Sequence, residues 1–465
     1  MNKVMKKCVS LALMLSLLAG LLCGLTGCSQ TSVSDFVWLE GEPTFGNSSQ
    51  DPFLNRSFDY MNRTFDYNYA EAQWIVVKGI DGTLKVLDYS GNQVAVLDYD
   101  KIESFHDGLA IVCKDNKYGF INTKAEIVVP LEFDEVTEFS EGFARVKKLV
   151  DDGRYYRYGF VNSSGELVVQ PEYDDAARAF TEGYAWVRKD GKSGFINGHG
   201  EIVIPLEYES VGSFREGLAS VQKEKGGKVG FINTAGECTI PMEFDIATAF
   251  LDGLAKVWIG GKCGFINTKG EIVIPIKYDE DSWNNFSEGL CQVKLSGKTG
   301  FIDTQGQLVI PTRYDGASDF SDGIAPVYVD KGTSRLWGAI NTKGEFVVPL
   351  NVGNYYPRVS DGLIKVGEVV DVLLVHYGYV DKDGNTVIPV QYRFADDFEG
   401  GVTVVGDDYG HGAIDRYGDV VIPLEYDHTY LANNGDVIFV EKDGKWGFCT
   451  VILPEEEREE KGKES

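Results

Sequence analysis

The chain is built from short stretches in which apolar and polar residues alternate. "GLAKVWI" (residues 253–259) alternates side chains with a period of two, as a half-buried strand does. "GFINT" (264–268) follows after a short glycine-containing turn. "EIVIP" (271–275) is a β-branched stretch that ends in a proline, which cannot donate to a continuing strand ladder. Since no segment shows the 3.6-residue period of an amphipathic helix, the sequence predicts an all-β protein.

The same three stretches recur along most of the chain, so internal repetition is its main feature. An eroded first unit, Leu84 to Asp100, carries Lys85 in place of the glycine that precedes the Phe-Ile-Asn stretch. We therefore count about eleven units between residues 74 and 454. The aligned glycines of the other ten units are Gly119, Gly159, Gly194, Gly230, Gly264, Gly300, Gly338, Gly378, Gly412 and Gly447.

A unit of this size cannot bury both faces of its small sheet, so neighbouring units must stack. We predict a tandem repeat of three- to four-stranded antiparallel meander units, arranged as a propeller or as an open superhelical array. Eleven units are many for one ring, which favours two propellers or an open spiral. Extra residues at 151–157, 330–336 and 368–377 all fall just before the aligned glycine, which predicts lengthened loops on one rim.

The unit resembles a known bacterial repeat. "GKWGFCT" (444–450) and "LWGAINTKGEFVVP" (336–349) are similar to the Lys-Trp-Gly-Phe core of the WG repeat, also written KWG. The family occurs in many bacterial surface proteins. The resemblance implies a repeat domain with no established catalytic activity, and it supplies no catalytic residue.

The N-terminus has the features of an export signal. Three lysines precede an apolar run that ends in Leu25-Thr26-Gly27-Cys28. This ending resembles the lipobox of bacterial lipoproteins, which implies cleavage after Gly27 and a diacylglycerol on the Cys28 thiol. The alternative is an uncleaved membrane anchor. We expect a signal peptide at residues 1–27, a tether at 28–73, repeats at 74–454 and a charged tail at 455–465.

The formal net charge of −27 narrows the possible partners. Such a surface repels nucleic acid and anionic lipid head groups, so nucleic acid is not an expected partner. The expected location is the extracytoplasmic face of a membrane, inner or outer, to which the N-terminal lipid attaches the chain.

Acidic residues recur at two places in the unit. One precedes the glycine of an "EG" turn, as Glu141 does, and the other follows an aromatic residue, as Asp174 does. Because repeat-equivalent positions have equivalent environments, we predict that these carboxylates accept backbone N–H groups in turns rather than forming a catalytic pair or cation sites. "DKDGN" (381–385) resembles part of a calcium loop but occupies the hairpin turn of the other units.

No other pattern points to a catalytic, metal or cofactor site. The five histidines show no metal-ligand spacing, and no nucleophile or phosphate-loop motif is present. Cys238, Cys291 and Cys449 replace apolar strand residues, so we expect buried thiols there. Cys263 stands directly before its aligned glycine, where we expect more exposure. We predict no metal, no cofactor and no enzyme activity.

The residue directly before the aligned glycine, here named the variable position, offers the best candidates for ligand binding. Polar residues at this position in other units, such as Ser193, Thr299 and His411, indicate that it is not deeply buried. A row of aromatic rings there could stack against sugars or a peptide, or else pack within the sheets. The candidate rings are Tyr118, Tyr158, Trp337, Tyr377 and Trp446.

Three functions remain open from the sequence. The first is a non-catalytic binding or adhesion lipoprotein that presents its repeats to a protein or glycan. The second is a structural spacer or assembly scaffold without a dedicated ligand. The third, less favoured, is a carbohydrate-active propeller enzyme.

Overall fold

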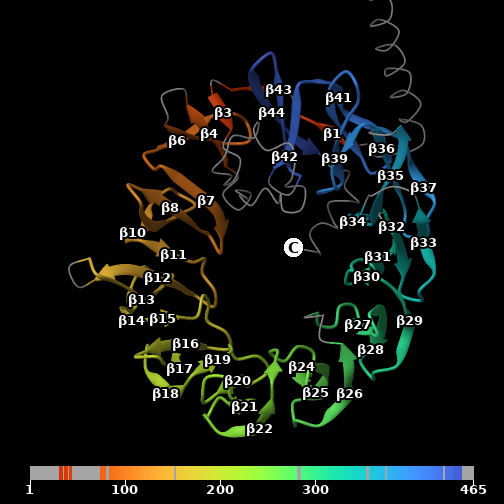
Figure 1. Ribbon diagram of the computed structural model, residues 1–465. Coiled ribbons are helices and arrows are strands. Elements are labelled where there is room, and N and C mark those ends of the chain that lie inside the picture. The colour runs from red at the N-terminus through yellow and green to blue at the C-terminus, as the bar shows by residue number, and fades with distance from the viewer. Residues whose placement is uncertain are drawn as a thin grey trace, which may run out of the picture.

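The described part of the chain forms a single ring of eleven small antiparallel sheets, a propeller with eleven blades (Figure 1). The computed structural model describes residues 31–34, 36–39, 41–43, 74–79, 83–150, 153–279, 284–332, 334–351, 356–371, 374–432 and 435–452. These residues include no helix, and none therefore that is long and apolar enough to cross a membrane. The all-β prediction is confirmed, whereas the preference for two propellers or an open spiral was wrong.

Blades 2 to 6 follow one plan, in which four strands form a meander and the first lies nearest the ring axis (Figure 1). Blade 2 contains β7 (Lys101–His106), β8 (Leu109–Lys114), β9 (Lys117–Asn122) and β10 (Ile127–Phe133); blade 3 contains β11 (Glu135–Val136), β12 (Phe143–Val150), β13 (Tyr155–Asn162) and β14 (Leu167–Tyr173); blade 4 contains β15 (Asp175–Ala176), β16 (Tyr184–Lys189), β17 (Lys192–Asn197) and β18 (Ile202–Tyr208); blade 5 contains β19 (Ser210–Val211), β20 (Leu218–Gln222), β21 (Val229–Asn233) and β22 (Cys238–Phe244); blade 6 contains β23 (Ile246–Ala247), β24 (Leu254–Ile259), β25 (Lys262–Asn267) and β26 (Ile272–Asp279).

Blades 7 to 10 repeat this plan, and blade 7 shows three strands in its described residues. Blade 7 contains β27 (Leu290–Leu295), β28 (Lys298–Asp303) and β29 (Leu308–Tyr314); blade 8 contains β30 (Gly316–Ala317), β31 (Ile324–Lys331), β32 (Ser334–Asn341) and β33 (Phe346–Asn351); blade 9 contains β34 (Arg358–Ser360), β35 (Leu363–Asp371), β36 (Leu374–Val380) and β37 (Thr386–Tyr392); blade 10 contains β38 (Phe394–Ala395), β39 (Val402–Gly406), β40 (His411–Asp415) and β41 (Val420–Tyr426).

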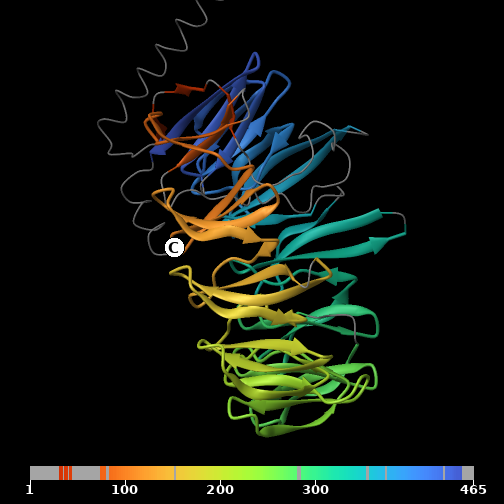
Figure 2. The ribbon, with the colours of Figure 1, turned by 90° about the vertical axis from the view of Figure 1, so that its left-hand side faces the viewer.

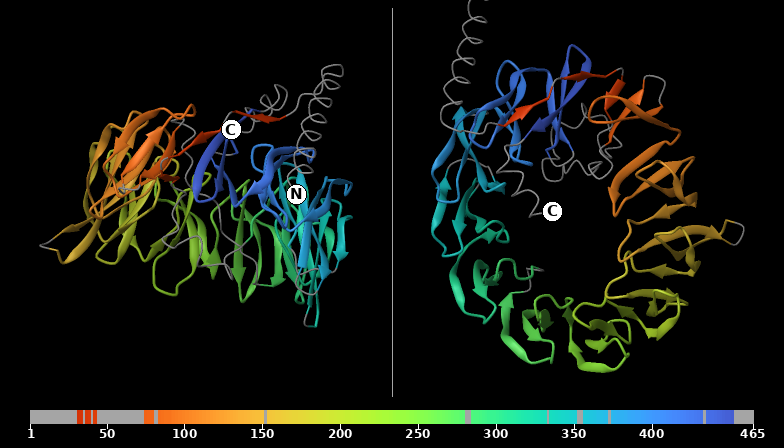
Figure 3. Two further views of the ribbon diagram at one scale, coloured as in Figure 1. Left: turned by 90° about the horizontal axis from the view of Figure 1, so that it is seen from above. Right: turned by 180° about the vertical axis from the view of Figure 1, so that it is seen from behind.

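The first and last blades are joined by strands from the N-terminal segment. Blade 1 contains β3 (Gly41–Pro43), β4 (Ile75–Gly79), β5 (Leu84–Leu87) and β6 (Gln93–Leu97); blade 11 contains β42 (His428–Ala432), β43 (Val437–Lys442) and β44 (Lys445–Ile452), with β1 (Ser32–Val33) and β2 (Val37–Trp38) paired to β44. From behind, these N-terminal strands bridge the blue last blade and the orange first one (Figure 3). The described residues 31–34, 36–39 and 41–43 are thus part of the ring, although we predicted that they belong to a tether.

Seams between neighbouring sheets form the core, and the sheets stack face to face around the ring (Figure 2). Between blades 3 and 4, Phe160 and Tyr173 pack against Val187 and Ile196. Phe180 closes this seam with its ring centroid 5.0 Å from that of Phe160, in an edge-on arrangement. Equivalent ring pairs recur at 4.6 to 4.9 Å in later seams. Each sheet therefore buries both faces only through its neighbours, as tandem stacking requires.

In blades 2 to 10, the aligned glycine is required by a bulge in the outer strand. In blade 6, Cys263 pairs with Tyr278 and Phe265 with Ile274, so β26 holds two extra residues over this interval. A Cβ on Gly264 would lie 2.4 Å from the Ile274 carbonyl oxygen and 2.8 Å from the Pro275 carbonyl carbon. Only glycine lets the bulged backbone pass this close.

Candidate functional site

The two edges of the ring are built from different turns, and we name them separately. The hairpin rim is formed by the turns between the second and third strands of each blade, such as residues 114–117 and 189–192, and in blade 7 by the turn between β27 and β28. The turn rim, at the opposite ends of these strands, is formed by the "EG" turns and the "NTKGE" turns. The long hairpins β12–β13, β31–β32 and β35–β36 all extend on the hairpin rim, which confirms that the inserted residues lengthen loops on one rim.

On the turn rim, the acidic residue of the "EG" turn joins one blade to the next in several blades, as at Glu141, Glu182 and Glu216. Glu141 and Gly142 both have positive φ, 51° and 81°, which makes a two-residue type I′ turn. The Glu141 carboxylate accepts backbone N–H groups of Glu182 and Gly183 in the next blade, both at 2.8 Å. Glu182 accepts in turn from Glu216 and Gly217. The prediction that these carboxylates accept backbone N–H groups in turns is confirmed. The N–H groups belong to the "EG" turn of the following blade, however, and not to the turn that holds the carboxylate itself.

On the hairpin rim, the acidic residue after the aromatic has a similar role. Asp279, at the end of blade 6, lies 2.6 Å from the Lys262 ammonium and accepts the N–H of Gly297 in blade 7 at 3.0 Å. The hydrogen bond from Lys262 is the largest cause that lowers the pKa of Asp279. A hydrogen bond from Lys298 likewise lowers the pKa of Asp315. This carboxylate therefore connects two hairpins and is held in its charged form.

The third repeated polar residue organises the "NTKGE" turn. The Asn267 side-chain oxygen accepts the N–H groups of Lys269 and Glu271, both at 3.0 Å. Asp381 of the calcium-like "DKDGN" makes the same two bonds, to the N–H groups of Asp383 and Asn385. Within the described ranges, no group of three or more His, Cys, Asp or Glu side chains is arranged to hold a metal ion.

At the variable position, the side chains lie in the seams at the hairpin ends of the strands. Ser193 and Thr299 are only 3% and 5% exposed, so the inference from polar residues that this position is not deeply buried was wrong. Cys263 is buried as well, contrary to prediction, because the face that carries it is covered by the next blade. Cys238 is exposed, also contrary to prediction. It stands first in an outer strand, where Ile202 and Ile272 of other blades are exposed too.

Trp337 lies in the best-defined aromatic cluster of the hairpin rim. Its ring centroid is 4.7 Å from that of Tyr328 and 4.9 Å from that of Tyr356. The Arg335 guanidinium lies 3.8 Å from the centre of the Tyr328 ring, within the range of a cation–π contact. Trp337 is half-buried, and its neighbours supply the packing that the alternative interpretation predicts.

Tyr158 lies at the base of the long β12–β13 hairpin and is also half-buried. Arg145 and Lys147 approach its ring, with centroid distances of 4.8 and 5.8 Å. Further out on the same hairpin, Tyr155 and Tyr156 are 56% and 48% exposed. This hairpin therefore carries aromatic side chains from the seam out to the solvent.

The other three candidate rings are half-buried as well. Tyr118 lies opposite Cys113, and burial raises the pKa of its hydroxyl. Tyr377 lies opposite Gly367 and packs with the apolar seam of blades 9 and 10. Trp446 stacks at 5.8 Å on Tyr430, at the end of a row of rings that crosses blades 10 and 11. The row consists of Phe394, His411, His428, Tyr430 and Trp446. The five candidates thus lie in separate seams and do not converge on one cavity.

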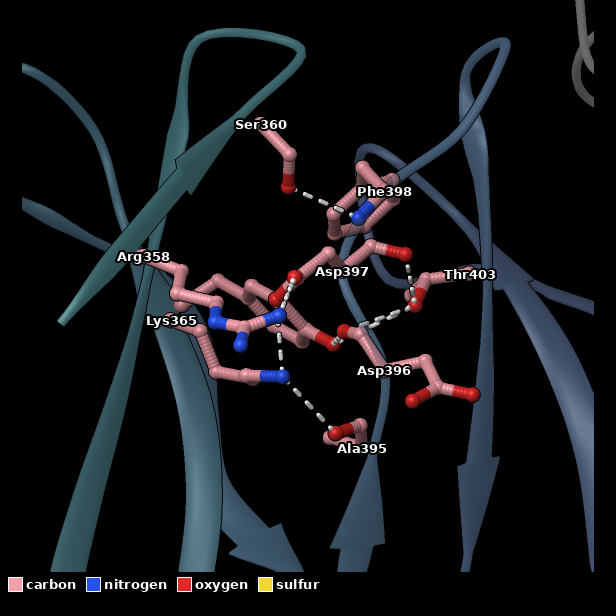
Figure 4. Close-up of polar contacts among 9 residues, drawn as sticks. Arg358, Ser360, Lys365, Ala395, Asp396, Asp397, Phe398 and Thr403 are labelled. Atoms are coloured by element: carbon pink, nitrogen blue, oxygen red, sulfur yellow. Dashed lines mark hydrogen bonds and ion pairs between the residues drawn. The ribbon is translucent and has the colours of Figure 1, made fainter. Parts of the chain in front are cut away.

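Charged side chains inside the seams also serve to join blades. Figure 4 shows Lys365 and Arg358 of blade 9 around Asp397 of blade 10, at 2.8 and 3.1 Å. The Lys365 ammonium also donates to the Ala395 carbonyl at 3.1 Å. Lys365 is 7% exposed, so this cluster connects two sheets rather than facing a substrate.

The sequence did not single out the most exposed aromatic residues of the hairpin rim. Tyr155 and Tyr156 fall in an insertion that was noted only for its length. Tyr409, 90% exposed, lies in the turn between β39 and β40. The sequence did contain a signal for these exposed rings, because each is an aromatic residue in a turn whose equivalents in other units are polar. Cys28, the predicted lipid site, lies outside the described residues.

Comparison with known proteins identifies the repeat. Ten segments match the WG-containing repeat, and together they run through most of the ring: 86–118, 118–149, 158–192, 194–228, 230–263, 264–298, 300–331, 337–366, 377–408 and 412–446. The chain belongs to the WG-containing repeat family. Each WG match covers about one blade, offset so that it begins near the third strand.

No curated protein matches the sequence of this WG-repeat chain. Among solved structures, it is similar to the crystal structure of the eukaryotic initiation factor, with a TM-score of 0.37 and 10% identity over 74% of this chain and 94% of the other. It is also similar to the tricorn protease (TM-score 0.24, 10% identity, 84% of this chain and 52% of the other) and to Streptogramin B lyase (0.24, 19%, 49% and 85%). At these TM-scores the likeness carries no argument about function.

Proposed function

We propose that this WG-repeat protein is a non-catalytic binding protein whose hairpin rim holds a protein or glycan. One observation carries the proposal. The repeated polar residues described above are bonded to neighbouring blades or to their own turns, whereas the hairpin rim also carries exposed rings: Tyr155 and Tyr156 on the lengthened β12–β13 hairpin, and Tyr409 in the β39–β40 turn. Exposed aromatic side chains supply contact area at a low cost in conformational entropy, and such residues dominate binding energies at interfaces.

The protein is further proposed to be attached by a lipid on Cys28 to the extracytoplasmic face of a membrane. Support comes from the signal-like N-terminus and its lipobox resemblance. Two or three acyl chains anchor a protein stably. A Cys28→Ala variant should leave the membrane fraction; if it stays there, the lipobox interpretation is wrong.

The binding proposal is tested with purified residues 29–465 in a pull-down and on a glycan array. We expect a partner at micromolar concentration. A Tyr155→Ala/Tyr156→Ala double variant should bind it at least tenfold more weakly, because two exposed rings of the hairpin rim are lost.

Tyr417→Ala is the matched control, since Tyr417 is 63% exposed but lies in an "NTKGE"-type turn on the turn rim. Its affinity should equal that of the wild type. If neither assay yields a ligand, the scaffold function replaces this proposal. If the control variant weakens binding as much as the double variant, the hairpin rim is not the binding face.

A further inference from the structure

The N-terminal strands take the place that an outer strand holds in every other blade. The Ser34 N–H donates to the Thr450 carbonyl at 2.9 Å, and the Leu39 N–H donates to the Trp446 carbonyl at 2.8 Å. The Thr450 N–H donates back to the Ser34 hydroxyl at 2.9 Å. As in the other blades, the chain then continues from the outer strand directly into the first strand of the next blade, here β3.

Apolar contacts fix this segment between three blades. The Phe36 ring lies 5.8 Å from the Tyr426 ring of blade 10. Trp38 covers Gly447 of blade 11, where a Cβ would lie 3.0 Å from the indole. Val37 fits against Gly91 of blade 1, where a Cβ would lie 2.5 Å from a Val37 methyl. Residues 36–38 are therefore held against blades 10, 11 and 1.

The register shows from which side the chain reaches the ring. Ser32 pairs with Ile452, and Trp38 pairs with Gly447. β44 begins at Lys445, beside the hairpin turn, and ends at Ile452 on the side of the turn rim. The segment therefore enters blade 11 at the turn rim and runs toward the hairpin rim.

We infer that a lipid bilayer meets the turn rim at blade 11, so that the hairpin rim faces away from the membrane. This inference rests on the lipidation of Cys28 proposed above. Cys28 precedes Ser32 by four residues, and four extended residues span at most about 14 Å. Acyl chains on Cys28 would therefore hold the turn rim of blade 11 close to the lipid head groups.

Charge does not contribute to this contact. Near blade 11, the described residues of the turn rim include Asp419 and Asp436 together with Arg416, and this mixed set of charges is not the basic cluster that binds anionic head groups. The acyl chains alone then hold the protein, and attachment should not weaken when salt is raised. The orientation also leaves the exposed tyrosines of the hairpin rim open to partners outside the cell membrane.

Two exposed tyrosines of blade 10 report the orientation. Tyr417 lies on the turn rim and Tyr409 on the hairpin rim, and both are well exposed. Lipidated full-length protein is bound to phosphatidylcholine vesicles that carry a photoreactive group on a fraction of the lipid head groups. After illumination, cross-links at the two tyrosines are quantified by mass spectrometry. We expect at least fivefold more at Tyr417.

Two variants separate the possible failures. Insertion of twenty Gly/Ser residues between Gln30 and Thr31 should preserve vesicle attachment but remove the bias, because such a linker has an end-to-end distance of about 25 Å. If Tyr409 is cross-linked as much as Tyr417 or more in the protein without the insertion, the proposed orientation is wrong, although the proposed lipid attachment is not contradicted. If the wild type does not float with vesicles, or if the wild type and Cys28→Ala float equally, the proposed lipidation of Cys28 is wrong. The proposed orientation, which depends on it, is then wrong too.

Discussion

At the scale of single residues, the acidic residue of the "EG" turn combines a left-handed backbone with a bond to the next blade. Glu182 has φ of 54°, a conformation that costs a non-glycine residue about 1–2 kcal/mol. Its carboxylate recovers free energy by accepting the N–H groups of Glu216 and Gly217. The carboxylate thus offers a physical reason for an acidic residue at a position where glycine would be less strained.

Replacement of Glu182 by alanine should lower the free energy of unfolding by about 1–3 kcal/mol, because two N–H groups lose their acceptor. Urea denaturation measures this loss. Asp252 is the matched control, since it has the same backbone conformation with φ of 53° but a shorter side chain, and within the described residues it makes no bond to the next blade. Asp252→Ala should lower the free energy of unfolding clearly less than Glu182→Ala does. An equal loss in both variants would show that the bond to the next blade is not the cause.

Because of the carboxylates of the hairpin rim, the stability of the fold should depend on pH. Hydrogen bonds from Lys262 and Lys298 lower the pKa values of Asp279 and Asp315 in the folded protein. A lowered folded-state pKa stabilises the fold above the ordinary carboxyl pKa of about 4, and this stabilisation is lost as the pH falls below that value.

The melting temperature of the wild type should therefore fall between pH 5 and pH 3. Asp279→Asn, which cannot titrate at this position, should melt below the wild type at pH 7 and approach it at pH 3. A constant difference between the two proteins across this range would show that the Asp279 carboxylate is not responsible.

At the scale of a single element, the outer strand depends on the glycine beneath its bulge. The carbonyl oxygen of the bulged strand lies within 2.7 Å of the Cβ position at all nine aligned glycines of blades 2 to 10. Blade 1 has Lys85 at the equivalent place, and there Leu84, Lys85 and Val86 pair in regular register with Leu97, Val96 and Ala95, so no bulge lies opposite Lys85. The bulge and the glycine thus occur together, which explains why the glycine recurs when the residue before it varies.

Gly264→Ala should cost about 3 kcal/mol, because the new methyl group meets backbone atoms of Ile274 and Pro275, which cannot change rotamer. Gly260→Ala is the control. A Cβ there meets nothing within 4 Å, so only its left-handed backbone, with φ of 60°, contributes a cost of about 1 kcal/mol. Thermal unfolding of both variants shows which of them loses more stability. A smaller loss of stability in Gly264→Ala than in the control would contradict the explanation.

At the scale of the whole molecule, local pattern predicted the blades but not their assembly. The alternation in "GLAKVWI" and the proline of "EIVIP" reveal the strands, and the insertions before Gly159 and Gly338 reveal the long hairpins. β1 and β2 hold only two residues each, too few to show a period, so the strands that close the ring were predicted as tether. The number of blades in one ring depends on the rotation between packed sheets, which no single unit encodes.

The candidate site was predicted less well for the same reason. Alternation tells which side chains share a face, but not which face the next blade covers. Cys263 and Ser193 are therefore buried where exposure was expected. Tyr158 and Trp337 share one repeat position, which the sequence reveals, whereas the greater exposure of Tyr155 and Tyr409 became evident only from the arrangement of the hairpins.

Hydroxyl-radical footprinting can decide whether the hairpin rim or the turn rim binds the partner. Residues 29–465 are footprinted with and without the partner recovered in the pull-down. We expect protection in the long hairpin of residues 147–158 and at Tyr409, with Tyr417 and the "EG" turns unchanged. Protection confined to Tyr417 and the turn rim would contradict binding at the hairpin rim.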